Sequence, residues 1–180
     1  MVKSKQIILG VTGSIAAYKA CEIINQLKKR RCNVTCVLTK EAEEFITPLT
    51  LQTLSGNQVI RGMFSLPQEF NPAHICLARQ AKLVLIAPAS ANIIAKLAAG
   101  LADDTLSALT LSTRAPVILC PAMNERMFTH KITQENIARL KKIGYRILGP
   151  IKGHLVCGDQ GLGHLADVAD IVREAMKILH

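Results

Sequence analysis

The sequence contains no tryptophan, and aromatic residues make up only 3% of its 180 residues. Since 49% of the residues are hydrophobic, the core must be built from aliphatic side chains. Such cores are typical of strands that are buried on both faces. The composition therefore favours an α/β fold over a β-sandwich.

Long apolar runs are also missing. No run approaches the roughly 18 residues of a membrane span, and the segment from Met1 to Gln6 is polar and leads into a short apolar stretch. We therefore expect a soluble, cytoplasmic protein that does not act at a membrane. A chain of this length suits one domain with a substantial core better than two, so residues 1–180 are expected to form a single domain.

Acidic residues are scarce as well. The chain has 13 acidic and 22 basic residues, which gives a net charge of +9. The run from Lys28 to Arg31 accounts for part of the excess and closes a predicted helix, where cations favour the helix dipole. With so few aromatics and no binding motif, nucleic acid is not expected as a partner. An anionic cofactor or substrate explains the charge equally well.

The six cysteines form neither a CxxC pair nor a repeating spacing, which argues against disulfides and against a metal site. Several lie in apolar segments, where free cysteine behaves as a small hydrophobic residue. Cys157 differs because glycines follow it closely at 158, 161 and 163. We interpret Cys157 as the one chemically active cysteine, with an ordinary loop cysteine as the alternative.

What is present is a repeated alternation of apolar strands and helical segments. Residues 6–11 predict a strand, Thr12-Gly13-Ser14 a tight turn, and residues 15–30 a helix. Ser14 is a candidate N-cap, and Gly13 is expected to let an anion such as a phosphate approach the backbone amides. The turn is not a GxGxxG motif, so it is weak evidence on its own.

Three further predicted strands end in small or polar residues. One ends at Thr39, one runs from residue 83 to 87 into a small polar turn before a helix over 93–99, and one, over 117–120, leads through Pro121 to Asn124. In a parallel sheet these ends meet at one edge, where ligands bind. Asn124 either binds such a ligand through its amide or caps the following helix.

The remaining segments give simpler expectations. Asp103 and Asp104 open a helix with Ser107 one turn in, Thr133 caps another helix, and residues 149–165 form a glycine-rich loop before a final amphipathic helix over 167–179. His74 precedes an apolar stretch and is a candidate base, because its pKa lies near neutrality, although a lone histidine is more often a surface residue.

Seven motifs in this order resemble one family. They are the segments 13–19 (GSIAAYK), 45–49 (FITPL), 72–75 (PAHI), 88–92 (PASAN), 102–104 (ADD), 121–124 (PAMN) and 157–163 (CGDQGLG). Together they resemble the homo-oligomeric flavin-containing cysteine decarboxylases, most closely the phosphopantothenoylcysteine decarboxylases of coenzyme A synthesis. The resemblance covers nearly the whole chain, without the synthetase domain that often follows in bacteria.

The resemblance implies a Rossmann-like, flavodoxin-like three-layer fold with a parallel sheet, FMN as cofactor, and trimers or dodecamers with sites between subunits. It also implies a separate phosphopantothenate-cysteine ligase as the pathway partner. The residues that would hold FMN are Gly13, Ser14, Ile15, Thr39, Ser90, Ala91, Asn92, Ile93, Ser107 and Ala122. His74 would act as base, Asn124 would bind the substrate carboxylate, and Cys157 would donate a proton. Met123, Gly158 and Asp159 would complete the substrate contacts.

The implied chemistry suits a substrate that ends in cysteine. Oxidation of the thiol to a thioaldehyde with FMN creates an electron sink, so that carbon dioxide can leave. Protonation by Cys157 and return of the electrons would then give phosphopantetheine. Alternatives are decarboxylation of another cysteine-terminated substrate, such as a peptidyl-cysteine, and a subunit that binds FMN without turnover.

The chain departs from the family pattern at two places. Cys76 stands where the family usually has an acidic residue after the histidine-isoleucine pair, and His164-Leu165 replaces an arginine-methionine pair after the last glycine. The second change lies on the implied substrate clamp, where Lys152 or His154 is a candidate replacement cation.

Overall fold

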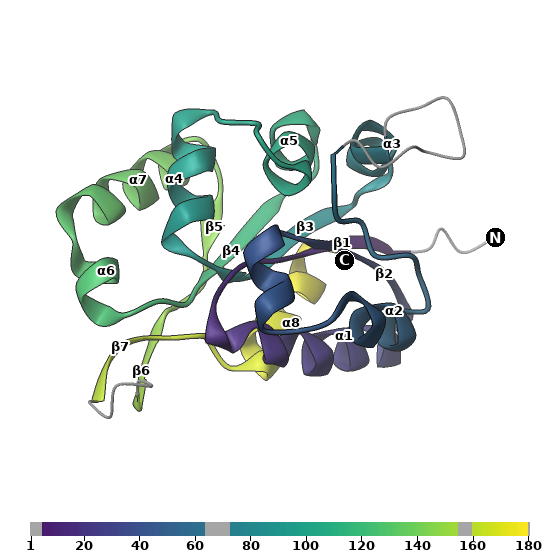
Figure 1. Ribbon diagram of the computed structural model, residues 1–180, viewed down its shortest axis with the longest axis horizontal. Helices are drawn as coiled ribbons and strands as arrows, with labels where there is room; N and C mark the ends of the chain where they lie inside the picture. Colours follow the sequence, from purple (N-terminus) through teal and green to yellow (C-terminus); the bar gives the residue numbers. More distant parts are fainter. Residues whose placement is uncertain (1–4, 64–72, 155–159, 180) are drawn as a thin grey trace.

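Five parallel strands form the centre of the protein, in the spatial order β2-β1-β3-β4-β5 (Figure 1). The computed structural model describes residues 5–63, 73–154 and 160–179. The strands are β1 (Lys5–Val11), β2 (Cys32–Leu38), β3 (Leu83–Ala89), β4 (Val117–Pro121) and β5 (Arg146–Ile147). Because they are all parallel, their carboxyl ends lie at one edge of the sheet and their amino ends at the other.

Helices cover both faces of this sheet, which confirms the predicted three-layer α/β fold (Figure 1). The helices packed on one face are α1 (Ala20–Lys29), α2 (Pro48–Ser55) and α8 (Val168–Ile178). Those on the other are α3 (Ala73–Gln80), α4 (Ala91–Ala99), α5 (Thr105–Ser112) and α7 (Lys131–Lys142). Shorter helical segments are η1 (Ile15–Lys19), η2 (Lys40–Glu44) and α6 (Glu125–Thr129).

The core is aliphatic, as the composition predicts. All seven residues of β3 are buried, and its alternate side chains pack into the two separate cores on either side of the sheet. Each fully buried Leu or Ile stabilises the fold by about 1.5–3 kcal/mol relative to an exposed one. Gly10 on β1 lets α5 approach closely, because a Cβ there would lie 2.6 Å from Cδ1 of Leu106.

Local residues define the ends of two helices. Thr47 caps α2, Pro48 occupies its first turn, and Gly56 ends it in the left-handed conformation. Helix α4 begins two residues earlier than predicted, because Ser90 accepts a hydrogen bond from the Ile93 backbone N–H and so acts as its N-cap.

Two local predictions are wrong. Thr133 lies inside α7, which begins at Lys131 with His130 as its N-cap. The predicted loop over residues 149–165 contains the antiparallel strands β6 (Ile151–His154) and β7 (Gln160–His164). The sequence pattern did not indicate these strands, because they contain glycines at 153, 161 and 163, and glycine is usually unfavourable in strand interiors.

A partly exposed charge cluster joins α4 to the start of α5. Lys96 Nζ lies 2.9 Å from Asp103 Oδ1 and 2.8 Å from Asp104 Oδ2. Asp104 also forms a capping box with Ser107, whose backbone N–H donates to Asp104 Oδ1 over 2.8 Å. Burial raises the pKa of Asp104, but Lys96 and the hydrogen bonds from Ser107 outweigh it and leave the pKa below its usual value.

No helix in the described ranges is long and apolar enough to cross a membrane.

We expect Asp104 to contribute a pH-dependent part of the stability. Its pKa is lower in the folded state, so the contribution is present above the unfolded pKa of about 3.9 and is lost as pH falls through the folded value. Asp104→Asn keeps a capping oxygen but removes the charge. Urea denaturation from about pH 7 to about pH 3 should show wild type more stable at neutral pH, with the gap closing below about pH 4. A gap that stays constant over this range would contradict the role of the charge.

Gly100 offers a test of backbone strain alone. It ends α4 with φ of 74°, and a Cβ added there would have no heavy atom within 4 Å. Gly100→Ala should therefore lower the free energy of unfolding by about 1 kcal/mol, because only the left-handed conformation is penalised. Gly100→Asn is the matched control, since asparagine tolerates this conformation and should cost less. Equal losses in the two variants would show that the conformation is not the cause.

Candidate functional site

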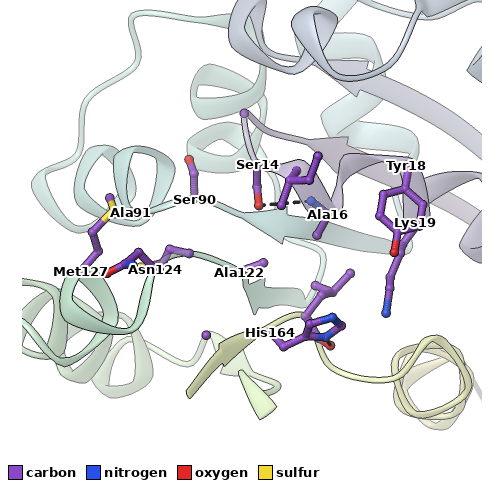
Figure 2. Close-up of a pocket in the computed structure, with 15 residues that line it drawn as sticks. Ser14, Ala16, Tyr18, Lys19, Ser90, Ala91, Ala122, Asn124, Met127 and His164 are labelled. Carbon is purple, nitrogen blue, oxygen red and sulfur yellow. Dashed lines mark hydrogen bonds between the residues drawn. The ribbon is translucent and has the colours of Figure 1, made fainter. Parts of the chain in front are cut away.

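A cavity of about 690 Å³ opens at the carboxyl edge of the sheet. Its lining comes from the turn after β1, the turn after β3, the segment between β4 and α6, and the end of β7 (Figure 2). This volume lies within the range of small-molecule and cofactor sites, about 300–1,000 Å³. The edge is the one at which the sequence predicts a ligand.

Thr12 fixes two of these turns to each other. Its hydroxyl donates to the Pro88 carbonyl oxygen over 2.8 Å and accepts from the Ser90 backbone N–H over 2.9 Å. Thr12 is only 1% exposed, so both hydrogen bonds are shielded from water. The turns after β1 and β3 are therefore held at a fixed separation across the floor of the cavity.

The turn after β1 contains Gly13, Ser14 and Ile15, and all three line the cavity. Ser14 is the N-cap of η1, as predicted, and its hydroxyl accepts from the Ala16 backbone N–H over 3.4 Å. Gly13 has a packing role that the sequence did not suggest. A Cβ there would lie 2.6 Å from Cβ of Glu41, so η2 requires glycine at this position.

The turn after β3 contributes Ser90 and Ala91 to the lining. Asn92 and Ile93, which were predicted with them, lie outside it because the helix turns them away. Asn92 is exposed, and Ile93 is 1% exposed within the core beside α5.

Ala122, Met123 and Asn124 follow β4 and line the cavity, and Figure 2 shows Ala122 and Asn124 across it from Ser14. Asn124 also caps α6, because its Oδ1 accepts from the Arg126 backbone N–H over 2.9 Å. The two interpretations of Asn124 are therefore compatible. Within the described residues its Nδ2 group makes no hydrogen bond, so the amide keeps its donors for a ligand.

The β6–β7 hairpin is attached to this wall through backbone contacts. The Met123 N–H donates to the Gly163 carbonyl over 3.0 Å, and the Leu162 N–H donates to Glu125 Oε1 over 3.0 Å. A Cβ at Gly163 would overlap the Met123 carbonyl oxygen, so this close approach requires glycine. The contacts place His164 and Leu165 in the cavity lining.

The polar groups of the cavity are distributed unevenly. Figure 2 shows Tyr18, Lys19 and His164 toward one end and Asn124 with Met127 toward the other. His164 Nδ1 lies 3.1 Å from the Leu165 carbonyl oxygen, which can only accept, so Nδ1 carries the proton in this contact. Lys19 therefore gives one end of the cavity a positive charge, and Asn124 gives the other end an amide.

Thr39 supports the fit of a cofactor at this edge. It follows β2, its N–H donates to the Val11 carbonyl over 3.1 Å, and its side-chain hydroxyl is buried without a partner in the described structure. A buried unsatisfied hydroxyl costs free energy unless a ligand pairs with it. The apolar walls, the Ser14 turn and Lys19 fit a flat ring system that carries a phosphate, as in a flavin.

Thr39 and Ser107 do not line the cavity either. Ser107 is 0% exposed, and its hydroxyl pairs with Asp104 in the capping box. His74 lies in α3, and no described residue of that helix lines the cavity. The side chain of His74 and residues Cys157, Gly158 and Asp159 lie outside what the structure describes.

Two other cysteines are poor candidates for chemistry. Burial raises the pKa of Cys36 to about 12, and it also raises the pKa of Cys120, which is 0% exposed on β4. Both remain thiols at neutral pH, and the thiolate is the nucleophilic form.

Sequence reasoning missed several lining residues, namely Ala16, Tyr18, Lys19, Met127 and Gly163. It also missed the role of Thr12. The one available signal was the position of Thr12 directly after an apolar strand, where a hydroxyl can bind a neighbouring turn.

The chain resembles curated proteins over most of its length. It is 47% identical over 175 residues to the probable phosphopantothenoylcysteine decarboxylase of Streptococcus mutans, covering 95% of this chain and 97% of that protein. It is 45% identical over 170 residues to the coenzyme A biosynthesis bifunctional protein CoaBC of Haemophilus influenzae, covering 94% of this chain. The chain spans only 42% of the length of that bifunctional relative.

Solved structures agree with the sequence relatives. A PPC decarboxylase mutant complexed with pantothenoylaminoethenethiol matches with a TM-score of 0.87 at 28% identity, over 98% of each chain. The FMN-dependent cysteine decarboxylase SpaF matches with a TM-score of 0.86 at 26% identity, over 100% of each chain. The family model described as Flavoprotein matches residues 1–180, so the chain belongs to the flavoprotein family.

Proposed function

We propose that the chain is an FMN-dependent decarboxylase that converts 4'-phosphopantothenoylcysteine to 4'-phosphopantetheine in coenzyme A biosynthesis. The relative from Streptococcus mutans supports this function, because it matches over nearly its full length and bears the name of this activity. Residues 1–180 act as a single domain in this proposal, and a separate phosphopantothenate-cysteine ligase supplies the substrate.

The observation that carries the proposal is the position of Asn124. Its amide lines the cavity on the wall opposite the Ser14 turn, where it can donate to a substrate carboxylate. FMN bound along the floor of the cavity would supply the oxidation of the substrate thiol that makes loss of carbon dioxide possible. Asn124 then holds the carboxylate and orients the thiol-bearing carbon toward the floor.

The residues proposed to hold FMN are those of the two connected turns. Gly13, Ser14 and Ile15 offer a helix start to the phosphate, since helix amino termini favour anions. Ser90, Ala91 and Ala122 lie against the ring system, and Thr39 pairs its buried hydroxyl with a polar group of the cofactor. Asn92, Ile93 and Ser107 contribute to FMN binding only indirectly, through the packing of α4 and α5.

We place the proposed base His74 in the site of a neighbouring copy, because no described residue of α3 lines the cavity of its own chain. Exposed apolar side chains around the cavity support assembly into a trimer or dodecamer. Ile15 is 53%, Tyr18 58% and Met127 50% exposed in the single chain, and such side chains commonly mark interfaces. Cys157 is the proposed proton donor, with Gly158 and Asp159 beside it in the substrate clamp.

A second candidate is decarboxylation of another substrate that ends in cysteine, such as a peptidyl-cysteine. The observation that favours it is His164 in the cavity lining, where the family pattern has arginine. Histidine lacks the always charged, bidentate guanidinium of arginine, so a different group would face the substrate phosphate.

Mass spectrometry of the reaction with phosphopantothenoylcysteine tests the proposal. The wild-type protein should release a product lighter than the substrate by one carbon dioxide. Asn124→Asp keeps an oxygen that caps α6 but faces the substrate carboxylate with a like charge, so kcat/KM should fall about 10- to 100-fold or more.

Thr47→Ala is the matched control, because it removes an N-cap from α2, which contributes no cavity lining. It should lower stability and leave kcat/KM unchanged. A product lighter by carbon dioxide and two further hydrogens would show that the final reduction fails. Flavin-containing protein with no turnover of this substrate would support the second candidate or a non-catalytic flavin-binding subunit.

Thr39→Val tests the cofactor contact, because it should affect the stability of the flavin-free protein and the affinity for FMN in opposite directions. Removal of a buried unsatisfied hydroxyl should stabilise the flavin-free protein or leave it unchanged, whereas loss of the hydrogen bond should raise the Kd for FMN about 2- to 10-fold. Flavin fluorescence titration and urea denaturation measure the two effects.

Thr35→Val provides the comparison. Thr35 is equally buried but already accepts a hydrogen bond from Gln6 Nε2 over 2.9 Å, so its replacement should destabilise the flavin-free protein without changing the Kd. An unchanged Kd for Thr39→Val would remove Thr39 from the cofactor site.

A further inference from the structure

A second cavity of about 660 Å³ lies at the opposite edge of the sheet, where β3 and β4 begin. Its lining comes from the end of α3, residues 81–82, residue 112 and residues 114–116. The volume is again in the range of ligand sites, about 300–1,000 Å³. None of its lining residues belongs to the first cavity.

Three exposed cations from two segments, residues 78–82 and 112–116, line this cavity, namely Arg79, Lys82 and Arg114. The lining segments contain no Asp or Glu. Across residues 5–63, 73–154 and 160–179, none of the three cations forms an ion pair, whereas Arg61, Lys96 and Arg146 each have a carboxylate partner. Unpaired like charges around one cavity repel one another, and a bound anion would relieve this repulsion.

Hydrogen bonds hold the backbone around these cations in place. The Lys82 N–H donates to the Gln6 carbonyl over 2.9 Å, which ties the segment to β1. The Thr113 hydroxyl donates to the Ala78 carbonyl over 3.0 Å, and the Val84 N–H donates to the Pro116 carbonyl over 3.0 Å. The cavity walls are therefore already ordered, which lowers the cost of binding.

Favourable interaction with helix dipoles explains only part of this charge. Arg79 lies in the last turn of α3, where a cation is stabilised by the helix carboxyl end. Lys82 and Arg114 each follow the end of a helix by two residues, and the dipole effect fades beyond the last turn. Lys82 and Arg114 therefore have no charge partner among the residues that the structure describes.

We propose that this second cavity binds a small phosphate-bearing molecule with at least two negative charges. Two guanidinium groups can each pair with phosphate oxygens through two parallel hydrogen bonds, and the Lys82 ammonium adds a third charge. Ser112 and the ordered backbone frame the site. The proposal is independent of the decarboxylase function, because the two cavities lie at opposite edges of the sheet.

Calorimetric titration of the purified, flavin-containing protein with inorganic tripolyphosphate at low salt tests the site. The double variant Lys82→Gln/Arg114→Gln should weaken binding about tenfold or more, since it removes two of the three positive charges that would pair with the anion. Lys131→Gln/Arg139→Gln is the matched control, because it removes one exposed lysine and one exposed arginine from α7. The control should retain wild-type affinity, and both doubles should retain decarboxylase activity.

Several results would overturn the proposal. They are the absence of tripolyphosphate binding, equal weakening in both double variants, and equally tight binding of citrate, which would reduce the effect to general charge. Tighter binding of a single-stranded oligonucleotide than of tripolyphosphate, with the same sensitivity to Lys82 and Arg114, would assign this surface to nucleic acid instead.

Discussion

The parallel direction of the strands is the constraint on which the rest of the structure depends. It forces every strand-to-helix turn to one edge of the sheet and every helix-to-strand turn to the other. The two edges then differ in the residues they favour, because helices begin at one edge and end at the other. The first edge gathers hydroxyls, small residues and helix amino termini, and the second gathers lysines and arginines.

At the carboxyl edge, one buried side chain connects parts that lie far apart in the sequence. Thr12 bonds to Pro88 and Ser90, so the turns after β1 and β3 form one rigid floor. The neighbouring strand β4 then places Asn124 against this floor, and the β6–β7 hairpin closes the wall through Gly163. A cofactor and a substrate carboxylate could therefore be held in fixed relation, which is what an oxidation followed by decarboxylation requires.

Glycines and caps at this site serve packing as well as function. Gly13 is required by the approach of Glu41, and Gly163 by the approach of the Met123 carbonyl. Asn124 caps α6 with its oxygen and keeps its nitrogen for a ligand. A residue at such a position can both stabilise the fold and bind a ligand. The structural and the chemical interpretation of the motif are therefore compatible.

The sequence by itself determined the layer architecture and most of the first wall of the site. Aliphatic strands alternating with helices predict a parallel sheet, and the residues after those strands, Ser14, Ser90 and Asn124, follow from local patterns. Only the tertiary structure decided which of these side chains meet. It excluded Asn92 and Ser107 from the cavity, because helix rotation and the capping box with Asp104 direct them elsewhere. It added Tyr18, Lys19 and Met127 to the lining, because the packing of the elements around the cavity leaves no local pattern in the chain.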